Sequence, residues 1–188
     1  MHQLTMVVIA ILLSGGCTSV VNTFTSEPIK PDPTKQGVVS SINDMKMGTY
    51  IGVHLKKADP ALDDSHITVS VVNSIVLLTG EVPTKALKSL AGEVSRSYLG
   101  VRKVHNELQV RSKTSILSRT NDTLLSTQIK TKLVFDNRID SSQVNVIAED
   151  GTIYLMGTTT QENAHLAALV ASNNSGVRRV VKVFEYVD

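Results

Sequence analysis

The cysteine at position 17 is the residue whose surroundings most clearly point to a chemical modification. It is the only cysteine in the 188 residues, and it follows an apolar run, MVVIAILL, and the small residues at 14–16. A run of this length is too short to span a bilayer as a helix but suits the core of a secretory signal. A cysteine placed in this way is typical of bacterial lipoproteins, in which the thiol takes a diacylglyceryl group and the peptide is cut in front of it. The sequence therefore predicts a lipoprotein signal peptide over residues 1–16 and lipid attachment at Cys17.

Two features depart from that bacterial pattern. Ser14 stands three residues before the cysteine, where leucine is usual, and no lysine or arginine precedes Lys30. The alternative interpretation is an ordinary buried or free thiol, since a lone cysteine offers neither an internal disulfide nor a thiolate metal site. Of the two interpretations, acylation would have the larger effect, because it would attach the protein to a membrane. Each buried methylene contributes about 0.8 kcal/mol, so two or three acyl chains anchor a protein firmly.

The residues after the cysteine predict where such an anchor would hold the chain. In Gram-negative lipoproteins an aspartate after the cysteine is the usual inner-membrane retention signal, and Thr18 stands there instead. By that resemblance we expect the outer membrane, with the protein facing the periplasm. Residues 17–43 are polar and punctuated by prolines. They are interpreted as a flexible tether with an r.m.s. reach of about 25–30 Å.

Residues for catalysis or for binding a cofactor are hard to find. The sequence contains no HExxH, no GxSxG and no glycine-rich phosphate loop. The acidic pairs at 63–64 and 149–150 fall in expected turns, where carboxylates are common. We therefore expect no enzyme, no cofactor and no metal site.

The charge pattern also argues against nucleic-acid binding. The net charge is +2, and lysines, arginines and carboxylates are interspersed along the chain. The chain has no tryptophan, four tyrosines and three phenylalanines. Proteins that bind a phosphate backbone normally show a basic excess on one domain or face. No nucleic-acid partner is expected.

The elements that would carry functional residues are clearest between residues 120 and 188. A helical segment, DTLLSTQIKTKLVF, precedes the alternating stretch VNVIAEDGTIYLMG, in which Asp150 and Gly151 supply the positive-φ turn of a hairpin. Thr160 is expected to cap a second helix, and a left-handed residue at Gly176 is expected where that helix ends. The segment VRRVVKVFEYV closes the unit as a strand.

An earlier segment repeats the same order of helix, strand, strand, helix and strand. Alignment of the two copies pairs Leu55 with Leu133, Gly80 with Gly157 and Gly100 with Gly176. The offset drifts only from 78 to 76, which indicates an internal duplication. Gly80 and Gly157 are interpreted as strand ends at which the backbone must turn.

The predicted organisation is a signal peptide, a tether and two small domains joined by a linker. The expected bounds are 1–16 for the signal peptide, 17–43 for the tether, 44–111 for the first domain, 112–119 for the linker and 120–188 for the second domain. A domain of about 70 residues buries only about 60% of its unfolded surface. Packing of one domain on the other is therefore expected.

Together these features resemble a known family. Each copy has a glycine, then about twenty residues, then Gly-Val and a short strand, and both copies lie downstream of a cysteine suited to lipidation. This pattern is similar to tandem BON domains of outer-membrane lipoproteins. The second copy carries the resemblance most strongly, from Asn121-Asp122-Thr123 through YLMG to GVRRV.

The resemblance implies an α+β fold in which each domain runs αββαβ, with a three-stranded mixed sheet packed on two helices. It also implies a non-enzymatic role in envelope integrity, with anionic phospholipid bound through the first helix of the second domain. In that family an aromatic residue of this helix, three after Asn121 in the present numbering, dips into the bilayer. Here the position is Leu124, which lacks the polar handle that suits tryptophan to the headgroup region. The resemblance therefore leaves lipid affinity and preference as points where this chain can differ from the family.

The same helix, taken residue by residue, predicts two faces. On a helical wheel Leu125, Ile129 and Leu133 form a core-facing stripe, whereas Leu124 and Phe135 share a face that the core does not use. Basic residues near the helix could meet phosphate groups, at about 1 kcal/mol each near an anionic surface. The expected phospholipid-binding residues are Leu124, Lys130, Lys132, Val134, Phe135 and Arg138.

Three interpretations of function remain open from the sequence. The leading one is a lipid-anchored protein that binds an anionic phospholipid membrane and supports envelope integrity. The second is a protein-interaction adaptor that docks an envelope assembly or a peptidoglycan-linked partner through a sheet edge or the groove between the domains. The third is a periplasmic chaperone-like role under osmotic stress. A separate alternative for Leu124 and Phe135 is that they pack against the first copy or residues 111–121 rather than meet a membrane.

Overall fold

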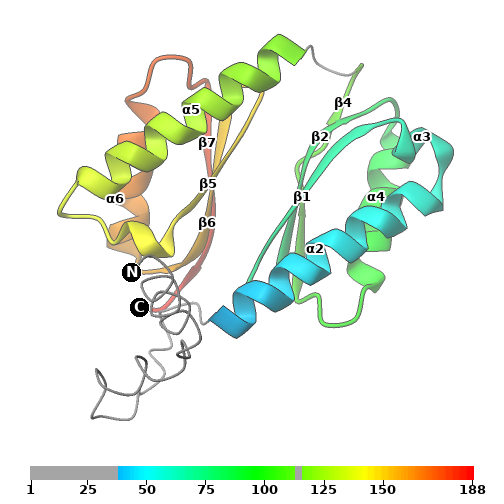
Figure 1. Ribbon diagram of the computed structural model, residues 1–188, viewed down its shortest axis with the longest axis horizontal. Coiled ribbons are helices and arrows are strands. Elements are labelled where there is room, and N and C mark those ends of the chain that lie inside the picture. The colour runs from blue at the N-terminus through cyan, green and yellow to red at the C-terminus, as the bar shows by residue number, and fades with distance from the viewer. Residues whose placement is uncertain (1–37, 113–115) are drawn as a thin grey trace, which may run out of the picture. The chain divides into compact units, whose positions relative to one another are not determined.

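The computed structural model describes residues 38–112 and 116–188 (Figure 1). These ranges belong to one compact unit that spans Pro33–Asp188. Cys17, the expected signal peptide and most of the expected tether lie outside the described residues. Their assignments therefore stay predictions.

The first repeat is a mixed sheet covered on one face by helices (Figure 1). Its helices are α2 (Val38–Ala58), α3 (Pro60–Asp63) and α4 (Lys85–Ser97). Its strands are β1 (His66–Val72), β2 (Ile75–Val82), β3 (Lys103–Asn106) and β4 (Gln109–Val110). The central strand β2 pairs antiparallel with β1 and parallel with β3 and β4.

The second repeat has the same order of elements. They are α5 (Ile116–Phe135), the short 3-10 helix η2 (Ser141–Gln143), β5 (Asn145–Glu149), β6 (Thr152–Thr159), α6 (Gln161–Ser172) and β7 (Arg179–Tyr186). The strand order is β5-β6-β7, with β5 antiparallel and β7 parallel to β6. The expected α+β fold, with helices packed on a mixed sheet in each repeat, is confirmed. Over the ranges that the structure describes, the second repeat has the expected three strands, whereas the first has four strands and the additional short helix α3.

Both leading helices begin earlier than the expected domain starts. Helix α2 begins at Val38, inside the segment expected as tether, and α5 begins at Ile116, inside the segment expected as linker. The aspartates near the expected starts, Asp44 and Asp122, lie within the helices. These aspartates are not N-caps of the helices. Each carboxylate instead accepts hydrogen bonds from the backbone of a hairpin turn.

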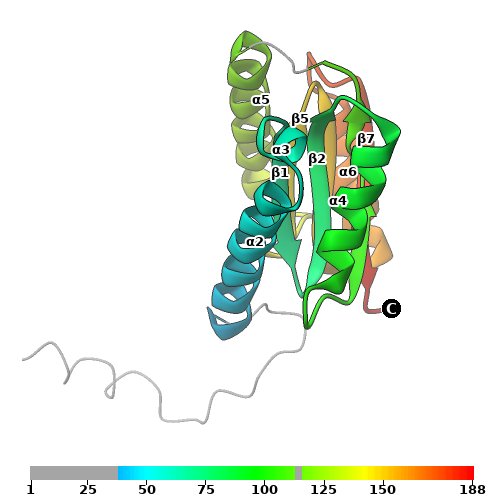
Figure 2. The same cartoon turned by 90° about the vertical axis from the view of Figure 1, so that its right-hand side faces the viewer.

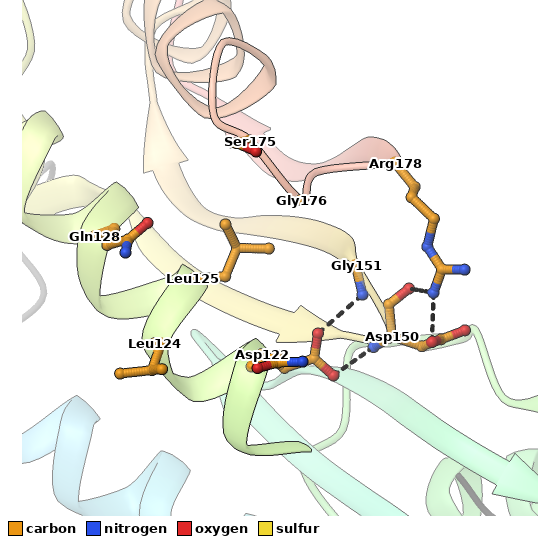
Figure 3. A pocket seen from close by; sticks show the side chains of 10 residues that line it. Asp122, Leu124, Leu125, Gln128, Asp150, Gly151, Ser175, Gly176 and Arg178 are labelled. Atoms are coloured by element: carbon orange, nitrogen blue, oxygen red, sulfur yellow. Dashed lines mark hydrogen bonds and ion pairs between the residues drawn. The ribbon is translucent and has the colours of Figure 1, made fainter. Parts of the chain in front are cut away.

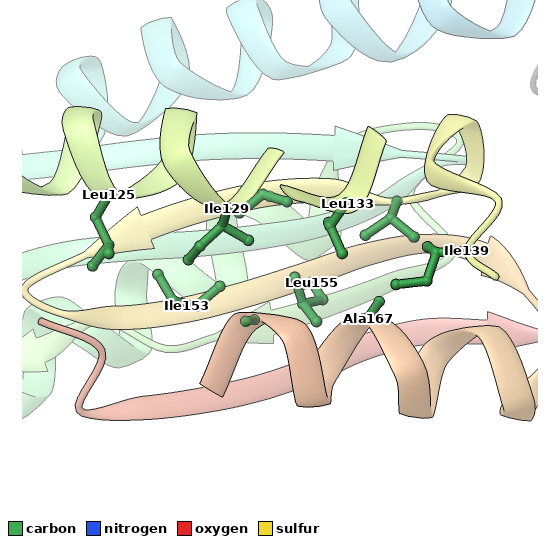
Figure 4. Packing of buried hydrophobic residues seen from close by; sticks show 10 residues of the cluster. Leu125, Ile129, Leu133, Ile139, Ile153, Leu155 and Ala167 are labelled. Carbon is green, nitrogen blue, oxygen red and sulfur yellow. The ribbon is translucent and has the colours of Figure 1, made fainter. Parts of the chain in front are cut away.

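The core of the second repeat lies between its helices and one face of its sheet (Figure 4). Leu125, Ile129 and Leu133 extend from α5 toward Ile153 and Leu155 of β6, and all five side chains are buried. The first repeat builds its core from the corresponding positions of α2 and β2. The core-facing stripe predicted for α5 is therefore confirmed.

Gly80 and Gly157 occupy strand interiors rather than strand ends, so the turn interpretation is wrong. Both have positive φ, +111° and +154°. A Cβ on Gly80 would lie 2.0 Å from the carbonyl oxygen of His66, and one on Gly157 would lie 1.8 Å from that of Gln143. Glycine is needed at both positions because another stretch of backbone passes too close for a side chain.

The two repeats pack through the faces of their sheets that the helices leave free. An apolar cluster joins them, made of Val72, Ile75, Leu77, Tyr154, Met156 and Val183. Polar contacts flank it: Arg102 makes a two-pronged ion pair with Glu185, at 2.6 and 3.0 Å. Every residue of β2 is buried because its alternate side chains meet helices on one face and the second repeat on the other.

Candidate functional site

Helix α5 presents apolar side chains on the face away from its core. Leu124 is 57% exposed, Val134 64% and Phe135 80%. The helical period explains this exposure, because the buried residues Leu125, Ile129 and Leu133 lie on the opposite face of α5. Large apolar side chains that remain this open on one helix are typical of a contact surface for a partner or a membrane.

The three basic residues expected beside this face have different environments. Arg138 lies beyond the end of α5 and forms a two-pronged ion pair with Asp136, at 2.7 and 2.9 Å. Hydrogen bonds from Arg138 lower the pKa of Asp136 to about 2. The Nζ of Lys132 donates to the Oδ1 of Asn174, which follows α6. Lys130 is exposed and makes no ion pair within the described residues, so it is the cation most open to a phosphate group.

A carboxylate of α5 fixes the nearby hairpin of the sheet. Asp122 is buried and accepts two backbone hydrogen bonds from the turn between β5 and β6, from the N–H of Asp150 at 2.6 Å and of Gly151 at 2.9 Å. Both turn residues have positive φ, 47° and 67°, as predicted for this turn. We call this arrangement of Asp122 and the turn the α5 clamp. It holds the helix at a set position two residues before Leu124.

The α5 clamp forms one wall of a hollow of about 400 Å³ (Figure 3). The residues that line it are Asn121, Asp122, Leu124, Leu125, Gln128, Asp150, Gly151, Ser175, Gly176 and Arg178. Arg178 is the only basic residue among them, and it donates to the backbone carbonyl of Asp150 and pairs with its carboxylate. Two carboxylates and one engaged arginine do not favour a phosphate inside the hollow. The exposed face of α5 is the better candidate for contact with lipid.

The first repeat contains an equivalent clamp, which sequence reasoning missed. Asp44 of α2 is buried and accepts from the N–H of Asn73 at 2.7 Å and of Ser74 at 2.9 Å, in the turn between β1 and β2. The sequence does contain a sign of this second clamp. Asp44 and Asp122 are separated by 78 residues, the same spacing that relates Leu55 to Leu133 in the two repeats. An aspartate within a predicted helix at matching places in both copies indicates a structural role for its side chain.

Two further properties of the described residues concern metals and membranes. Residues 38–112 and 116–188 contain no group of three or more histidine, cysteine, aspartate or glutamate side chains placed to hold a metal ion. None of the helices in these ranges is both long enough and apolar enough to traverse a bilayer.

Comparison with known proteins identifies relatives along most of the chain. Outer membrane lipoprotein DolP of Haemophilus influenzae is 34% identical over 160 residues, which cover 85% of this chain and 82% of that protein. The 21 kDa hemolysin of Actinobacillus pleuropneumoniae is 30% identical over 156 residues, covering 83% and 79%. Osmotically-inducible protein Y of Escherichia coli is 31% identical over 156 residues, covering 77% of each.

The match to a known domain family occurs twice, once in each of the two repeats. The sequence profile of the BON domain matches residues 51–112 and, separately, residues 121–188. The first match falls in the repeat that contains β1 to β4, and the second in the repeat that contains β5 to β7. The chain therefore belongs to the BON-domain family and carries one such domain in each repeat.

Proposed function

We propose that this protein is a lipid-anchored component of the outer membrane that faces the periplasm, binds anionic phospholipid through α5 of its second BON domain and supports envelope integrity. The observation that carries the proposal is the exposed apolar face formed by Leu124, Val134 and Phe135. The relative from Haemophilus influenzae is named an outer membrane lipoprotein, which supports the proposed location. Exposed apolar residues on a helix that also carries lysines are typical of helices that lie in a membrane interface.

The contact needs only modest intrinsic affinity if the chain is already anchored. Full burial of a leucine or phenylalanine side chain contributes about 1.5–3 kcal/mol, and partial insertion contributes less. A tether keeps the effective concentration of the helix at the surface high, so a weak contact is occupied most of the time. This reasoning is compatible with Leu124 in the place where the family has an aromatic residue.

Intact-mass spectrometry tests the anchor. The protein extracted from cell membranes is expected to begin at Cys17 and to carry the added mass of a diacylglyceryl group and an amide-linked acyl chain. A Cys17→Ser variant should stay unprocessed and lack that mass. An unmodified Cys17 in the membrane-extracted protein would contradict the proposed anchor.

Vesicle binding tests the α5 face. The compact unit of residues 33–188, mixed with phosphatidylglycerol vesicles, is expected to co-sediment less at higher salt. Leu124→Asp combined with Phe135→Asp should weaken binding at least about tenfold, because two apolar contacts are lost and two negative charges approach an anionic surface.

A variant of equal charge and similar loss of apolar surface provides the control. Leu169 of α6 and Val187 after β7 are also exposed, so Leu169→Asp with Val187→Asp should bind vesicles as the parent does. Equal binding by the parent and the α5 variant would remove the lipid role from α5. If the α5 variant then still captured its envelope partners, the adaptor interpretation would replace the proposed one.

A further inference from the structure

The first BON domain also exposes apolar side chains on its leading helix. Met47, Ile51 and Leu55 of α2 face the core, and the opposite side of the helix carries Ile42, Met45, Tyr50 and Val53. All four side chains are exposed, Met45 the most at 67%. We call these four residues the α2 face. Within the described part of the chain, each of the four side chains is at least 41% exposed.

Lysines of α2 surround the α2 face with positive charge. Lys46 and Lys57 are exposed and form no ion pair within the described ranges, whereas Lys56 pairs with Asp63 at 3.5 Å. The only acidic residue of α2 is Asp44, whose buried carboxylate accepts the two hydrogen bonds of the hairpin turn. The helix therefore presents apolar groups and ammonium groups without an exposed carboxylate. This combination matches a surface of anionic phospholipid.

The apolar surface continues beyond the helix. Tyr50 stacks on Tyr98, with ring centroids 6.2 Å apart, and the next residue, Leu99, is 93% exposed. Beside the α2 face a hollow of about 480 Å³ opens between α2 and β1, where Gly48 and Gly52 leave the helix without side chains. An aromatic group at the edge of an apolar surface suits the boundary between headgroups and acyl chains.

The place of α2 in the chain favours the membrane over a free partner protein. The helix begins at Val38, 21 residues after Cys17 (38 − 17). A flexible segment of that length has an r.m.s. reach of about 25 Å. If the proposed anchor holds and the intervening segment is flexible, the start of α2 stays within about that distance of the bilayer.

Helices α2 and α5 are also placed so that one surface can meet both. Figures 1 and 2 show them on the same side of the compact unit, with α4 and α6 on the other. Strand β1, which α2 covers, borders a hollow that is lined in turn by Thr123 and Ser126 of α5.

We propose that the α2 face is a second contact with an anionic phospholipid bilayer, made by the first BON domain in addition to the contact of α5. This inference rests on the proposed membrane function but concerns different residues. The two contacts together would hold the protein against the membrane in one orientation.

Site-specific labelling tests the proposal on the full chain. An environment-sensitive fluorophore is attached at Val53→Cys, and the protein is reconstituted into phosphatidylcholine vesicles with or without phosphatidylglycerol that carry spin-labelled quencher lipids. We expect quenching of this label with phosphatidylglycerol and a marked loss of quenching at high salt. A label at Glu93→Cys, exposed on α4, is the matched control and should remain unquenched. The parent chain without an added cysteine is the blank.

Charge variants sharpen the same measurement. Lys46→Gln and Lys57→Gln should each lower the equilibrium constant for surface contact about fivefold, as expected for a lysine near an anionic surface. The same change at Lys85 and Lys103, exposed on α4 and β3, should leave quenching at position 53 within about twofold of the parent.

A third label, at Phe135→Cys, separates this proposal from the α5 contact. Quenching at 135 without quenching at 53 would overturn the α2 contact and leave the proposed function in place. Quenching at 53 without quenching at 135 would support the α2 contact and remove the role of α5. If position 53 is quenched no more than position 93, or is shielded only when a protein partner is added, the α2 face does not bind the bilayer.

Discussion

Replacement of Asp122 by alanine is expected to lower the free energy of unfolding by about 3 kcal/mol, because two charge-assisted hydrogen bonds are lost and two backbone donors are left without them. The N–H groups of Asp150 and Gly151 point at the Asp122 carboxylate from a turn whose φ angles are positive. The carboxylate is buried, so water does not easily replace it. The loss should therefore fall at the high end of the range for single substitutions.

Two related substitutions test whether the destabilisation comes from the lost hydrogen bonds of the clamp or only from the lost negative charge. Asp122→Asn keeps one acceptor oxygen, so it should cost about half as much as alanine. Asp44→Ala removes the equivalent clamp of the first repeat and should destabilise the protein by a similar amount. Denaturant unfolding followed by circular dichroism measures all three changes.

A surface aspartate supplies the control for this series. Asp63 forms an exposed ion pair with Lys56, and Asp63→Ala should change the free energy of unfolding by no more than about 0.5 kcal/mol. If Asp122→Ala proves as stable as Asp63→Ala, the carboxylate does not hold the hairpin. Because Leu124 follows two residues after the clamp, the destabilised variant should also bind vesicles less well.

Features governed by local sequence were predictable. The spacing of Leu125, Ile129 and Leu133 identified the buried side of α5, because burial of a surface helix follows its own period. The turn at Asp150 and Gly151 was predictable because few residue types accept positive φ. The exposed side of α5 was predicted from the same period.

Features that depend on distant residues were not predictable. Asp122 binds backbone 28 and 29 residues later, and no periodic pattern records such a partner. The ion pair of Arg138 with Asp136 depends on the path of the chain after α5 ends, so the sequence did not show that this arginine has a carboxylate partner. The glycines in β2 and β6 are needed because a neighbouring backbone approaches, and a sequence alone does not show that approach.

The surface between the repeats holds a carboxylate whose burial makes stability depend on pH. Glu149 ends β5 and is buried, and its Oε1 lies 3.6 Å from the Nε2 of His66 in the first repeat. Burial raises the pKa of Glu149 from 4.5 to about 7, and the negative charges of Glu81, Asp122 and Asp150 add to the rise while Arg119 opposes it. The folded protein therefore favours the protonated form of this side chain.

The sign of the effect follows from proton linkage. A carboxyl group with a raised pKa in the folded state binds its proton more tightly there than in the unfolded chain. Its contribution is most favourable below pH 4.5 and is lost as the pH rises through about 7. The full shift corresponds to about 3 kcal/mol, and partial contact with solvent reduces the expected loss to about 2 kcal/mol.

Glu149→Gln is therefore expected to stabilise the protein by about 2 kcal/mol at pH 8 and to leave it nearly unchanged at pH 4.5, since the amide resembles the protonated acid. Unfolding curves of parent and variant at several pH values measure this, and their difference removes the contribution of groups that do not contact Glu149. Glu162→Gln, the same change at an exposed position of α6, should have an effect below about 0.5 kcal/mol at every pH. A difference between parent and Glu149→Gln that does not grow from pH 4.5 to pH 8 would show that Glu149 is ionised without cost, and that the two repeats pack equally well around its charge.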